Sequence, residues 1–271
     1  VELAQVFARF GVQVSVVEAA PRLVPLEEPE ASDLLSKVFA AEHIAVHTDA
    51  KIISAHKDDE QVVLDLEGPG PVRGERLLVA TGRRPHLAAL GAATIGVDEG
   101  GRSLPTDEYM RVTDGVWAIG DVTGHGAFTH MSMYEATIAV DDILGRAGTG
   151  AEYHAVPRVT FTDPEIGSVG MTEEQAHAAG VTVRTALSPL PDSARGWIHG
   201  PGNEGFIKLV EDAERGVLVG ATSAGPSGGE VLSMLALAVH ARIPTHELRR
   251  MIFAYPTFHR AVEPALDALR Q

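Results

Sequence analysis

Hydrophobic positions in the first part of the chain recur with two periods, one typical of helices and one typical of strands. Residues 1–10 carry apolar side chains at the spacing of one helix face, and Gly11 follows as a helix stop. A run of valines at 12–17 predicts a strand that ends at Glu18. A second helix is predicted at 29–42. Further strand patterns lie at 44–48, 51–57, 61–66 and 76–80, with a Gly-Pro-Gly-Pro turn at 68–71.

This order of helices and strands is typical of the latter part of a small α/β nucleotide-binding domain, which we place at residues 1–79. A helix at the very start, followed by a strand, indicates a βαβ unit whose first strand is absent. We therefore expect the chain to be a fragment of a longer protein. Residues 80–150 are richer in loops but contain a strand pattern at 116–121 and a helix pattern at 131–145.

The last part of the chain, residues 151–271, has a different pattern. Strands are predicted first, and helices gather toward the end, which indicates an α+β domain. Thr172 is a predicted helix cap, and Gln175 is its capping-box partner. The strand patterns lie at 156–162, 205–212 and 216–225, and the helix patterns lie at 172–179, 230–240, 245–252 and from Pro264 onward.

Composition narrows the classes of function. The chain has 271 residues and a net charge of -15, so we expect no nucleic-acid partner, because phosphates would be repelled. No apolar run is long enough to span a membrane. The absence of cysteine excludes a disulfide framework and a redox dithiol within these residues, and it favours a cytoplasmic protein. The histidines show no metal-ligand spacing, so we expect no metal site.

Glu18 is a candidate cofactor-binding residue. A carboxylate at the end of the second strand of a dinucleotide-binding unit accepts hydrogen bonds from ribose hydroxyls and repels a 2′-phosphate, which favours NAD over NADP. The alternative is a solvated glutamate at a strand end. Arg22 lies close enough in sequence to weaken the preference, and no Gly-rich turn precedes the first helix within the chain.

The stretch VWAIGDVTG at 116–124 carries the second candidate. A carboxylate closing a buried strand points into the crevice where open α/β sheets bind ligands. Gly120 removes a side chain there, and Asp121 offers acceptors to a polyol. The alternative is an ordinary turn aspartate.

Several segments together resemble the pyridine nucleotide-disulfide oxidoreductases, the flavoenzyme family that includes dihydrolipoamide dehydrogenase, glutathione reductase and mercuric reductase. The resemblance runs along nearly the whole chain and follows the family order. The matching segments are VELAQVFARFGVQVSVVEAAPRLVP, VATGRRP, WAIGDVTG, FTHMSMYEA, VPRVTFTDPEIGSVGMTEEQA, GFIKLVED and GVLVGATSAGPSGGEVL.

The resemblance implies a partial NAD-binding domain, the C-terminal part of an FAD-binding domain, and a dimerisation domain that forms a homodimer through 151–271. It implies FAD and NAD as cofactors, with hydride passing from nicotinamide to flavin and then to a small-molecule acceptor. The implied contacts are Asp121 with the flavin ribityl hydroxyls, the backbone at His130 and Met131 with the isoalloxazine, Gly82 in a tight return beside the cofactor, Glu2 near the nicotinamide, and Glu18 on the NAD ribose.

One segment departs from the family pattern. Thiol-handling members carry His-Pro-Thr near the C-terminus, with a Glu that orients the His. Here FAYPTFHRAVEPAL places Tyr255 at the His position and Arg260 at the Glu position, while His259 is displaced. A phenol is a poorer base than an imidazole at neutral pH, but it can donate a hydrogen bond. Tyr255 is therefore the candidate catalytic residue, with packing filler as the alternative.

Three functional hypotheses stay open at this point. The parent protein is an FAD-dependent NAD(P)H oxidoreductase that reduces a disulfide, a metal or another acceptor through a dithiol outside this chain. Alternatively, the parent protein is a dithiol-free quinone reductase or transhydrogenase. Or the chain as it stands is an inactive dimerisation module.

Overall fold

The computed structural model describes residues 1–68, 70–146 and 148–270, and these form two compact units. The larger unit contains Val1–Leu77 and His154–Gln271, and the smaller unit contains Leu78–Tyr153. The division into three domains at 79/80 and 150/151 stays a prediction. Pro69, in the expected Gly-Pro-Gly-Pro turn, lies outside the described residues.

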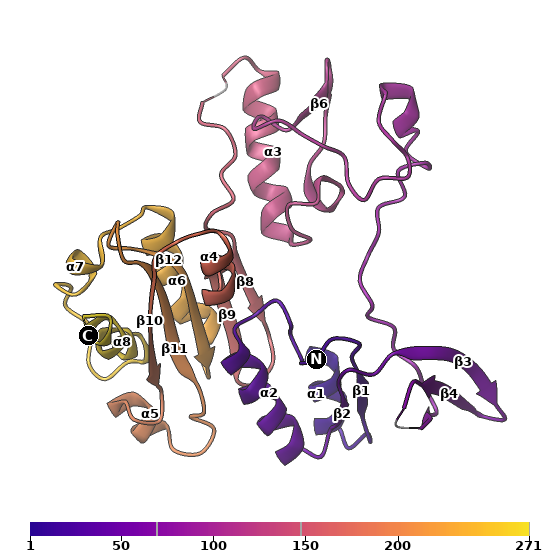
Figure 1. Ribbon diagram of the computed structural model, residues 1–271, viewed down its shortest axis with the longest axis horizontal. Coiled ribbons are helices and arrows are strands. Elements are labelled where there is room, and N and C mark those ends of the chain that lie inside the picture. The colour runs from indigo at the N-terminus through magenta and orange to yellow at the C-terminus, as the bar shows by residue number, and fades with distance from the viewer. Residues whose placement is uncertain (69, 147, 271) are drawn as a thin grey trace. The chain divides into compact units, whose positions relative to one another are not determined.

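The first part of the larger unit alternates helices and strands, as expected (Figure 1). Strands β1 and β2 pair in parallel, with Ser15 opposite Ala45, and β3, β4 and β5 form an antiparallel sheet. The elements are α1 (Glu2–Arg9), β1 (Ser15–Val17), α2 (Pro29–Ala41), β2 (Ala45–His47), β3 (Ile52–Asp58), β4 (Gln61–Leu66) and β5 (Val72–Gly74).

The strand predicted at 76–80 is wrong. Residues 75–81 form no strand, and β5 lies earlier, at Val72–Gly74. Leu78 and Val79 are more than half exposed and have no neighbouring strand to pair with in the described part of the chain. An apolar run becomes a strand only where a partner satisfies its backbone, and the described residues supply no such partner here.

The rest of the larger unit is built on a five-stranded antiparallel sheet in the order β10-β11-β12-β9-β8. The predicted α+β class is confirmed. The strands are β8 (Pro157–Thr160), β9 (Glu165–Gly170), β10 (Val183–Pro189), β11 (Phe206–Asp212) and β12 (Val217–Gly225). The helices are α4 (Glu173–Ala178), α5 (Ala194–His199), α6 (Gly228–His240), α7 (Thr245–Leu248) and α8 (Val262–Ala268), with a 3-10 turn η3 (Phe258–Ala261).

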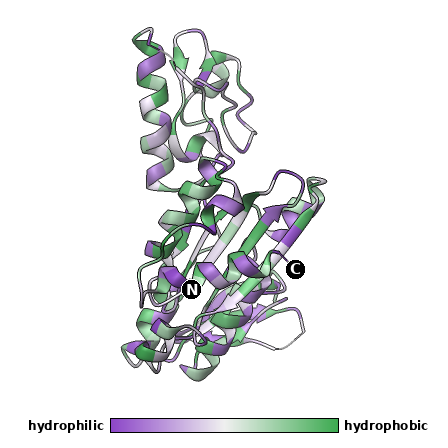
Figure 2. Cartoon of the chain, turned by 90° about the vertical axis from the view of Figure 1, so that its left-hand side faces the viewer, coloured by the Kyte–Doolittle hydropathy of each residue, from purple (hydrophilic) through white to green (hydrophobic). Residues whose placement is uncertain are grey.

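Helices cover both faces of this sheet. On one face, α6 and α8 bury leucines and valines against β11 and β12, including Leu209, Leu218 and Leu235. On the other face, Leu35 and Phe39 of α2 pack on Ile166 and other sheet residues. The helices carry hydrophobic and hydrophilic residues together (Figure 2), as expected of helices with one buried side. The first part of the larger unit and the α+β part therefore share one core.

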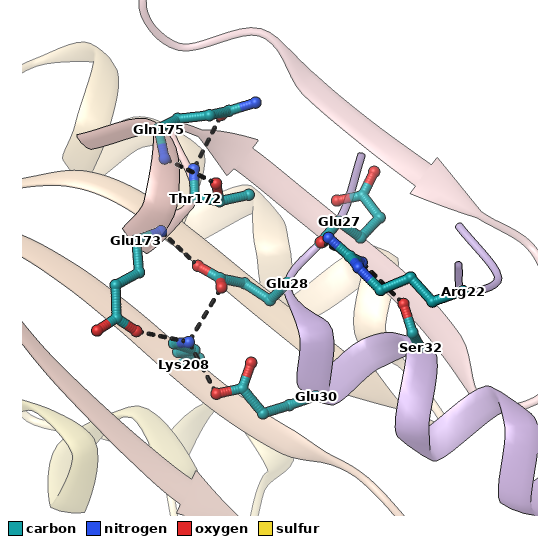
Figure 3. A network of polar contacts seen from close by, with 9 residues as sticks. All are labelled: Arg22, Glu27, Glu28, Glu30, Ser32, Thr172, Glu173, Gln175 and Lys208. Atoms are coloured by element: carbon teal, nitrogen blue, oxygen red, sulfur yellow. Dashed lines mark hydrogen bonds and ion pairs between the residues drawn. The ribbon is translucent and has the colours of Figure 1, made fainter. Parts of the chain in front are cut away.

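A buried charge network reinforces this contact (Figure 3). Lys208 of β11 is 4% exposed, and its Nζ lies 3.0 Å from Glu28 Oε2, 2.8 Å from Glu30 Oε1 and 2.9 Å from Glu173 Oε2. The backbone N–H of Glu173 donates to Glu28 Oε1 at 2.8 Å. Burial lowers the pKa of Lys208, but the three carboxylates outweigh burial and raise it overall, so the lysine is charged.

The smaller unit contains one long helix and short elements around it. Its elements are the 3-10 turn η1 (Ala92–Ile95), β6 (Arg111–Thr113), β7 (Val116–Trp117), the 3-10 turn η2 (Gly120–Thr123) and α3 (Thr129–Ile143). Strands β6 and β7 pair with each other in an antiparallel ribbon. Asp142 of α3 anchors this ribbon, because it accepts hydrogen bonds from Arg111 Nε at 2.6 Å and from Trp117 Nε1 at 2.8 Å.

Candidate functional site

Asp121 lies in a turn rather than at the end of a strand. The strand expected at 116–121 stops at Trp117, and Asp121 is the second residue of η2. Gly120 has a φ of 78°, and a Cβ there would fall 2.6 Å from Ser132 Oγ, so only glycine fits. This left-handed residue ends the extended run. In the described part of the chain, β7 pairs only with β6 and both of its residues are half-buried, so it is not the buried strand that was expected.

Glu135 fixes the turn at Gly120–Thr123 through hydrogen bonds. Its side chain is fully buried and accepts the backbone N–H of Gly120 at 2.5 Å. The hydroxyls of Thr123 and Tyr153 each lie 3.1 Å from Glu135 Oε1. Burial, together with the negative Glu135, raises the pKa of Tyr153, so the phenol stays a hydrogen-bond donor. Glu135 was absent from the predicted site, although FTHMSMYEA already placed it within the matching segments.

One oxygen of Asp121 is engaged and the other is open. Arg83 Nη1 lies 3.0 Å from Asp121 Oδ2, while Arg83 Nη2 donates to the carbonyl of Ala127 at 3.1 Å. The Asp121 side chain is 44% exposed, and Oδ1 has no hydrogen-bond partner among the described residues. An oriented carboxylate with one free oxygen can accept a hydrogen bond from a ligand hydroxyl. Arg83, in the VATGRRP segment, is a site residue that sequence reasoning missed.

Gly82 lies beside this pair. It has a φ of 98°, and a Cβ there would meet nothing within 4 Å, so the backbone is open on that side. A hollow of about 370 Å³ is lined by Gly82 with Thr81, Arg83, Arg84 and Arg102. The tight turn of the chain expected at Gly82 therefore lies beside a positively charged hollow.

His130 and Met131 lie in the first turn of α3. The helix starts after Phe128, whose side chain makes no cap, and the His130 ring stacks on Phe128 with 5.2 Å between centroids. Met131 is 3% exposed, and its backbone N–H donates to the Phe128 carbonyl at 3.0 Å, so the exposed His130 is the residue of this pair that can face a ligand. The N-terminus of a helix of this length carries partial positive charge and favours an electron-rich group.

The two candidate glutamates lie in the larger unit. Glu2, at the start of α1, accepts the backbone N–H of Phe161 at 2.6 Å, so its carboxylate joins α1 to the segment after β8. Glu18 follows β1 directly and accepts the N–H of Ala20 at 2.8 Å. The backbone N–H of Glu18 bonds to the carbonyl of His47, which puts Glu18 at the carboxyl edge of the β1–β2 pair.

Tyr255 lies between α7 and η3 and is 69% exposed. The guanidinium of Arg260 stands 5.5 Å from its ring centroid. Arg260 also pairs with Glu263 at 2.9 Å. The helix expected at 245–252 ends at Leu248, and Ile252, just before Tyr255, is 98% exposed. Tyr255 thus presents an exposed ring beside a cation.

The structure gathers Asp121, Gly120, Gly82, His130 and Met131 in the smaller unit, and Glu2, Glu18 and Tyr255 in the larger unit. No cluster of three or more His, Asp or Glu among the described residues is arranged to hold a metal ion. None of the helices in the described residues is both apolar enough and long enough to cross a membrane.

Family models match both parts of the chain. The model described as pyridine nucleotide-disulphide oxidoreductase matches residues 1–141, and the model of the dimerisation domain of the same enzymes matches residues 156–266. The expected fold class, an α/β dinucleotide-binding part followed by an α+β dimerisation domain, is confirmed by these matches and by the solved structures below.

Curated relatives extend beyond this chain. A mercuric reductase of Streptomyces lividans is 35% identical over 269 residues, which are 97% of this chain and 56% of that protein. A dihydrolipoyl dehydrogenase of Chlorobaculum tepidum is 34% identical over 276 residues, covering 100% of this chain and 59% of that protein. The chain therefore spans between half and two thirds of the length of these relatives.

Two solved structures have the same fold. LpdA from Mycobacterium tuberculosis matches with a TM-score of 0.89 at 27% identity, over 99% of this chain and 59% of LpdA. The HOCl-induced flavoprotein disulfide reductase RclA from Escherichia coli, in a Cu(II) complex, matches with a TM-score of 0.86 at 26% identity, over 98% of this chain and 60% of RclA.

Proposed function

This chain belongs to the pyridine nucleotide-disulphide oxidoreductase family, and on that premise we propose that the whole protein is an FAD-dependent NAD(P)H oxidoreductase. The observation that carries the proposal is the turn at Gly120–Thr123, where buried Glu135 fixes the backbone and Asp121 keeps one oxygen free. A rigid carboxylate acceptor of this kind suits a sugar-alcohol chain.

The residues of the smaller unit fit part of an FAD molecule. Asp121 would accept from the ribityl hydroxyls, and the uncapped start of α3 at Thr129 and His130, just before buried Met131, would face the electron-rich edge of the ring. When bound, the flavin would accept a hydride from the nicotinamide and pass two electrons on. Glu18 would hold the NAD ribose, and Glu2 would lie near the nicotinamide.

We further infer a homodimer formed through residues 151–271. The match to a dimerisation domain over 156–266 supports this, and so does a set of exposed apolar side chains in the same region. Trp197 is 80% exposed, Ile198 is 50% exposed, and Ile252 is 98% exposed. Large apolar side chains left in water favour burial against a second copy.

In this proposal the electron acceptor is a small molecule that binds beside Tyr255. The hydroxyl of Tyr255 would donate to the acceptor as electrons arrive, and Arg260 would supply positive charge beside it. The chain contains no cysteine, so a dithiol relay, if used, lies outside these residues. The pairing of a tyrosine with an arginine favours direct reduction of an acceptor, such as a quinone, over thiol chemistry.

FAD titration of the full-length protein tests this function. We expect the wild type to bind FAD and to oxidise NADH, and Asp121→Ala to weaken FAD binding at least about tenfold, the loss of one charge-assisted hydrogen bond. Glu135→Gln should weaken FAD binding as well, because the N–H₂ group of glutamine is a donor and would face the donor groups from which Glu135 accepts. Asp114→Ala, an exposed carboxylate in the same unit, is the control. A full-length protein that takes up no FAD would leave the dimerisation-module hypothesis standing.

A further inference from the structure

A second hollow lies near Tyr255 in the larger unit. It has a volume of about 220 Å³, and its charged lining residues are Arg195, Arg260 and Glu263. Two cations therefore face one anion, in a chain whose net charge is -15. We refer to it as the Arg195–Arg260 pocket. A hollow of this size is smaller than those that enclose whole ligands, so it suits one group of a ligand.

Both guanidinium groups are held by aromatic rings. The Arg195 guanidinium lies 5.2 Å from the Phe258 ring centroid, and the Arg260 guanidinium lies 5.5 Å from that of Tyr255. A ring positions a guanidinium without neutralising it. Arg260 is partly neutralised by Glu263, but Arg195 has no acidic partner within the described residues. Arg195 therefore keeps its hydrogen-bond donors available.

The hydroxyls around the pocket are already committed. Ser193 Oγ donates to the Leu190 carbonyl at 2.7 Å and accepts the Gly196 N–H at 3.0 Å. Thr257 Oγ1 donates to the Ala254 carbonyl at 2.8 Å. What is left for a ligand is chiefly guanidinium donors. Such a lining selects a flat or tetrahedral anion, because arginine binds carboxylate and similar oxyanions through two parallel N–H groups.

We propose that the Arg195–Arg260 pocket binds the anionic group, a carboxylate or sulfonate, of an aromatic electron acceptor. Pro256 lines the pocket and follows Tyr255 directly, and the exposed Tyr255 ring offers an apolar surface for the rest of the molecule. The inference rests on the proposed function. For a quinone, NADH and one proton deliver two electrons and two protons in total, which yields NAD⁺ and the hydroquinone.

The test compares a charged and a neutral acceptor. The full-length, FAD-loaded protein would be assayed with NADH and either 1,4-naphthoquinone-2-sulfonate or 1,4-naphthoquinone. Because the two quinones differ in potential, the readout is the ratio of their kcat/KM values, compared between variants. We expect Arg195→Gln to lower the sulfonate-to-neutral ratio about tenfold, mainly through KM, as for a lost charge-assisted hydrogen bond. Arg250→Gln removes an exposed arginine outside the pocket and should leave the ratio unchanged.

A redox-inactive probe separates failure of this inference from failure of the proposed function. Calorimetric titration with naphthalene-2-sulfonate should show binding that Arg195→Gln weakens, even if no NADH oxidation is found. An unchanged ratio together with unchanged probe binding would overturn the inference while leaving the oxidoreductase intact. If inorganic sulfate competes as well as the naphthalene probe, the pocket is a general anion site, and its assignment to the acceptor is wrong.

Discussion

Arg260 stands over the ring of Tyr255, with its guanidinium 5.5 Å from the ring centroid. Thiol-handling members of the family carry a histidine and an orienting glutamate at the corresponding positions. A carboxylate behind an imidazole supports a base, whereas a cation over a phenol leaves the hydroxyl as a donor. The two substitutions thus act together and change what this surface offers to a substrate.

Replacing Tyr255 by phenylalanine tests the hydroxyl alone. The ring and its contact with Arg260 are kept, so folding should be unaffected. If the hydroxyl donates to the acceptor in the transition state, kcat for acceptor reduction should fall by about tenfold or more, with little change in the KM for NADH. Tyr109→Phe, which keeps a ring near Arg111 in the smaller unit, is the matched control. Equal kcat values for wild type and Tyr255→Phe would mean that the tyrosine is packing filler.

A buried lysine predicts a large loss of stability. Lys208→Met would leave Glu28, Glu30 and Glu173 without their cation, and breaking a buried ion network typically costs about 3–5 kcal/mol. Lys51 pairs with Glu67 at 3.4 Å with both side chains well exposed, so Lys51→Met should cost no more than about 1 kcal/mol. Denaturant unfolding of both variants measures the difference.

The network also sets up a rescue experiment. Adding Glu28→Gln to Lys208→Met removes one of the stranded charges, so the double variant should regain part of the lost stability. If Lys208→Met is no less stable than Lys51→Met, the network does not hold α2 onto the sheet.

Sequence reasoning was most successful where local chemistry decides the structure. The capping box at Thr172 and Gln175 is present in full, because its four groups lie within four residues. Strands β6, β9 and β10 and helix α5 were missed. Four of the six residues of β9 are fully buried, so no alternation marks it, and α5 is a single short helix after a proline-containing turn.

The candidate site, too, could be predicted only in part from the sequence. The residue types at Asp121, Glu18 and Tyr255 were readable from spacing and resemblance. Arg83 was not, because it reaches Asp121 through a tertiary contact that no local pattern encodes, and the bond between buried Glu135 and the Gly120 N–H was hidden for the same reason. Arg260 was readable, since the resemblance had already placed it at the position of the orienting glutamate. Gly120 shows how one backbone angle changed an expected strand end into a turn.

The Asp142 anchor predicts a dependence of stability on pH. Hydrogen bonding to Arg111 lowers the pKa of Asp142 below its usual value, despite the opposing effect of burial. The stabilisation is therefore complete above the unfolded-state pKa of about 4 and is lost as pH falls through the lower folded-state pKa. The stability gap between wild type and Asp142→Asn should be widest near neutral pH and should narrow below about pH 4.

Trp117 reports on this anchor directly, since its indole donates to Asp142. Unfolding followed by its fluorescence, in a Trp197→Phe background, isolates the smaller unit from the only other tryptophan in the chain. Asp141→Asn changes a more exposed neighbour and should show no comparable narrowing. A gap that stays constant from pH 7 to pH 3 would contradict the role of Asp142.

Glu18 predicts the choice between NADH and NADPH. Arg22 is held within the chain, since its Nη1 donates to the Glu27 carbonyl at 2.8 Å and to Ser32 Oγ at 2.9 Å. On the proposed function, the carboxylate of Glu18 at the carboxyl edge of β1 would lie next to an incoming 2′-phosphate. Repulsion between the two groups at close range disfavours NADPH.

Glu18→Gln is the sharpest variant, since the amide oxygen can still accept the Ala20 N–H that closes the turn. In the full-length protein, the ratio of kcat/KM for NADPH over NADH should rise about tenfold, in line with removing one negative charge at a partly screened distance. Glu60→Gln changes an exposed carboxylate in the β3–β4 hairpin and should leave the ratio unchanged. If Glu18→Gln instead lowers both kcat/KM values equally, the carboxylate supports the fold of the turn and does not select the cofactor.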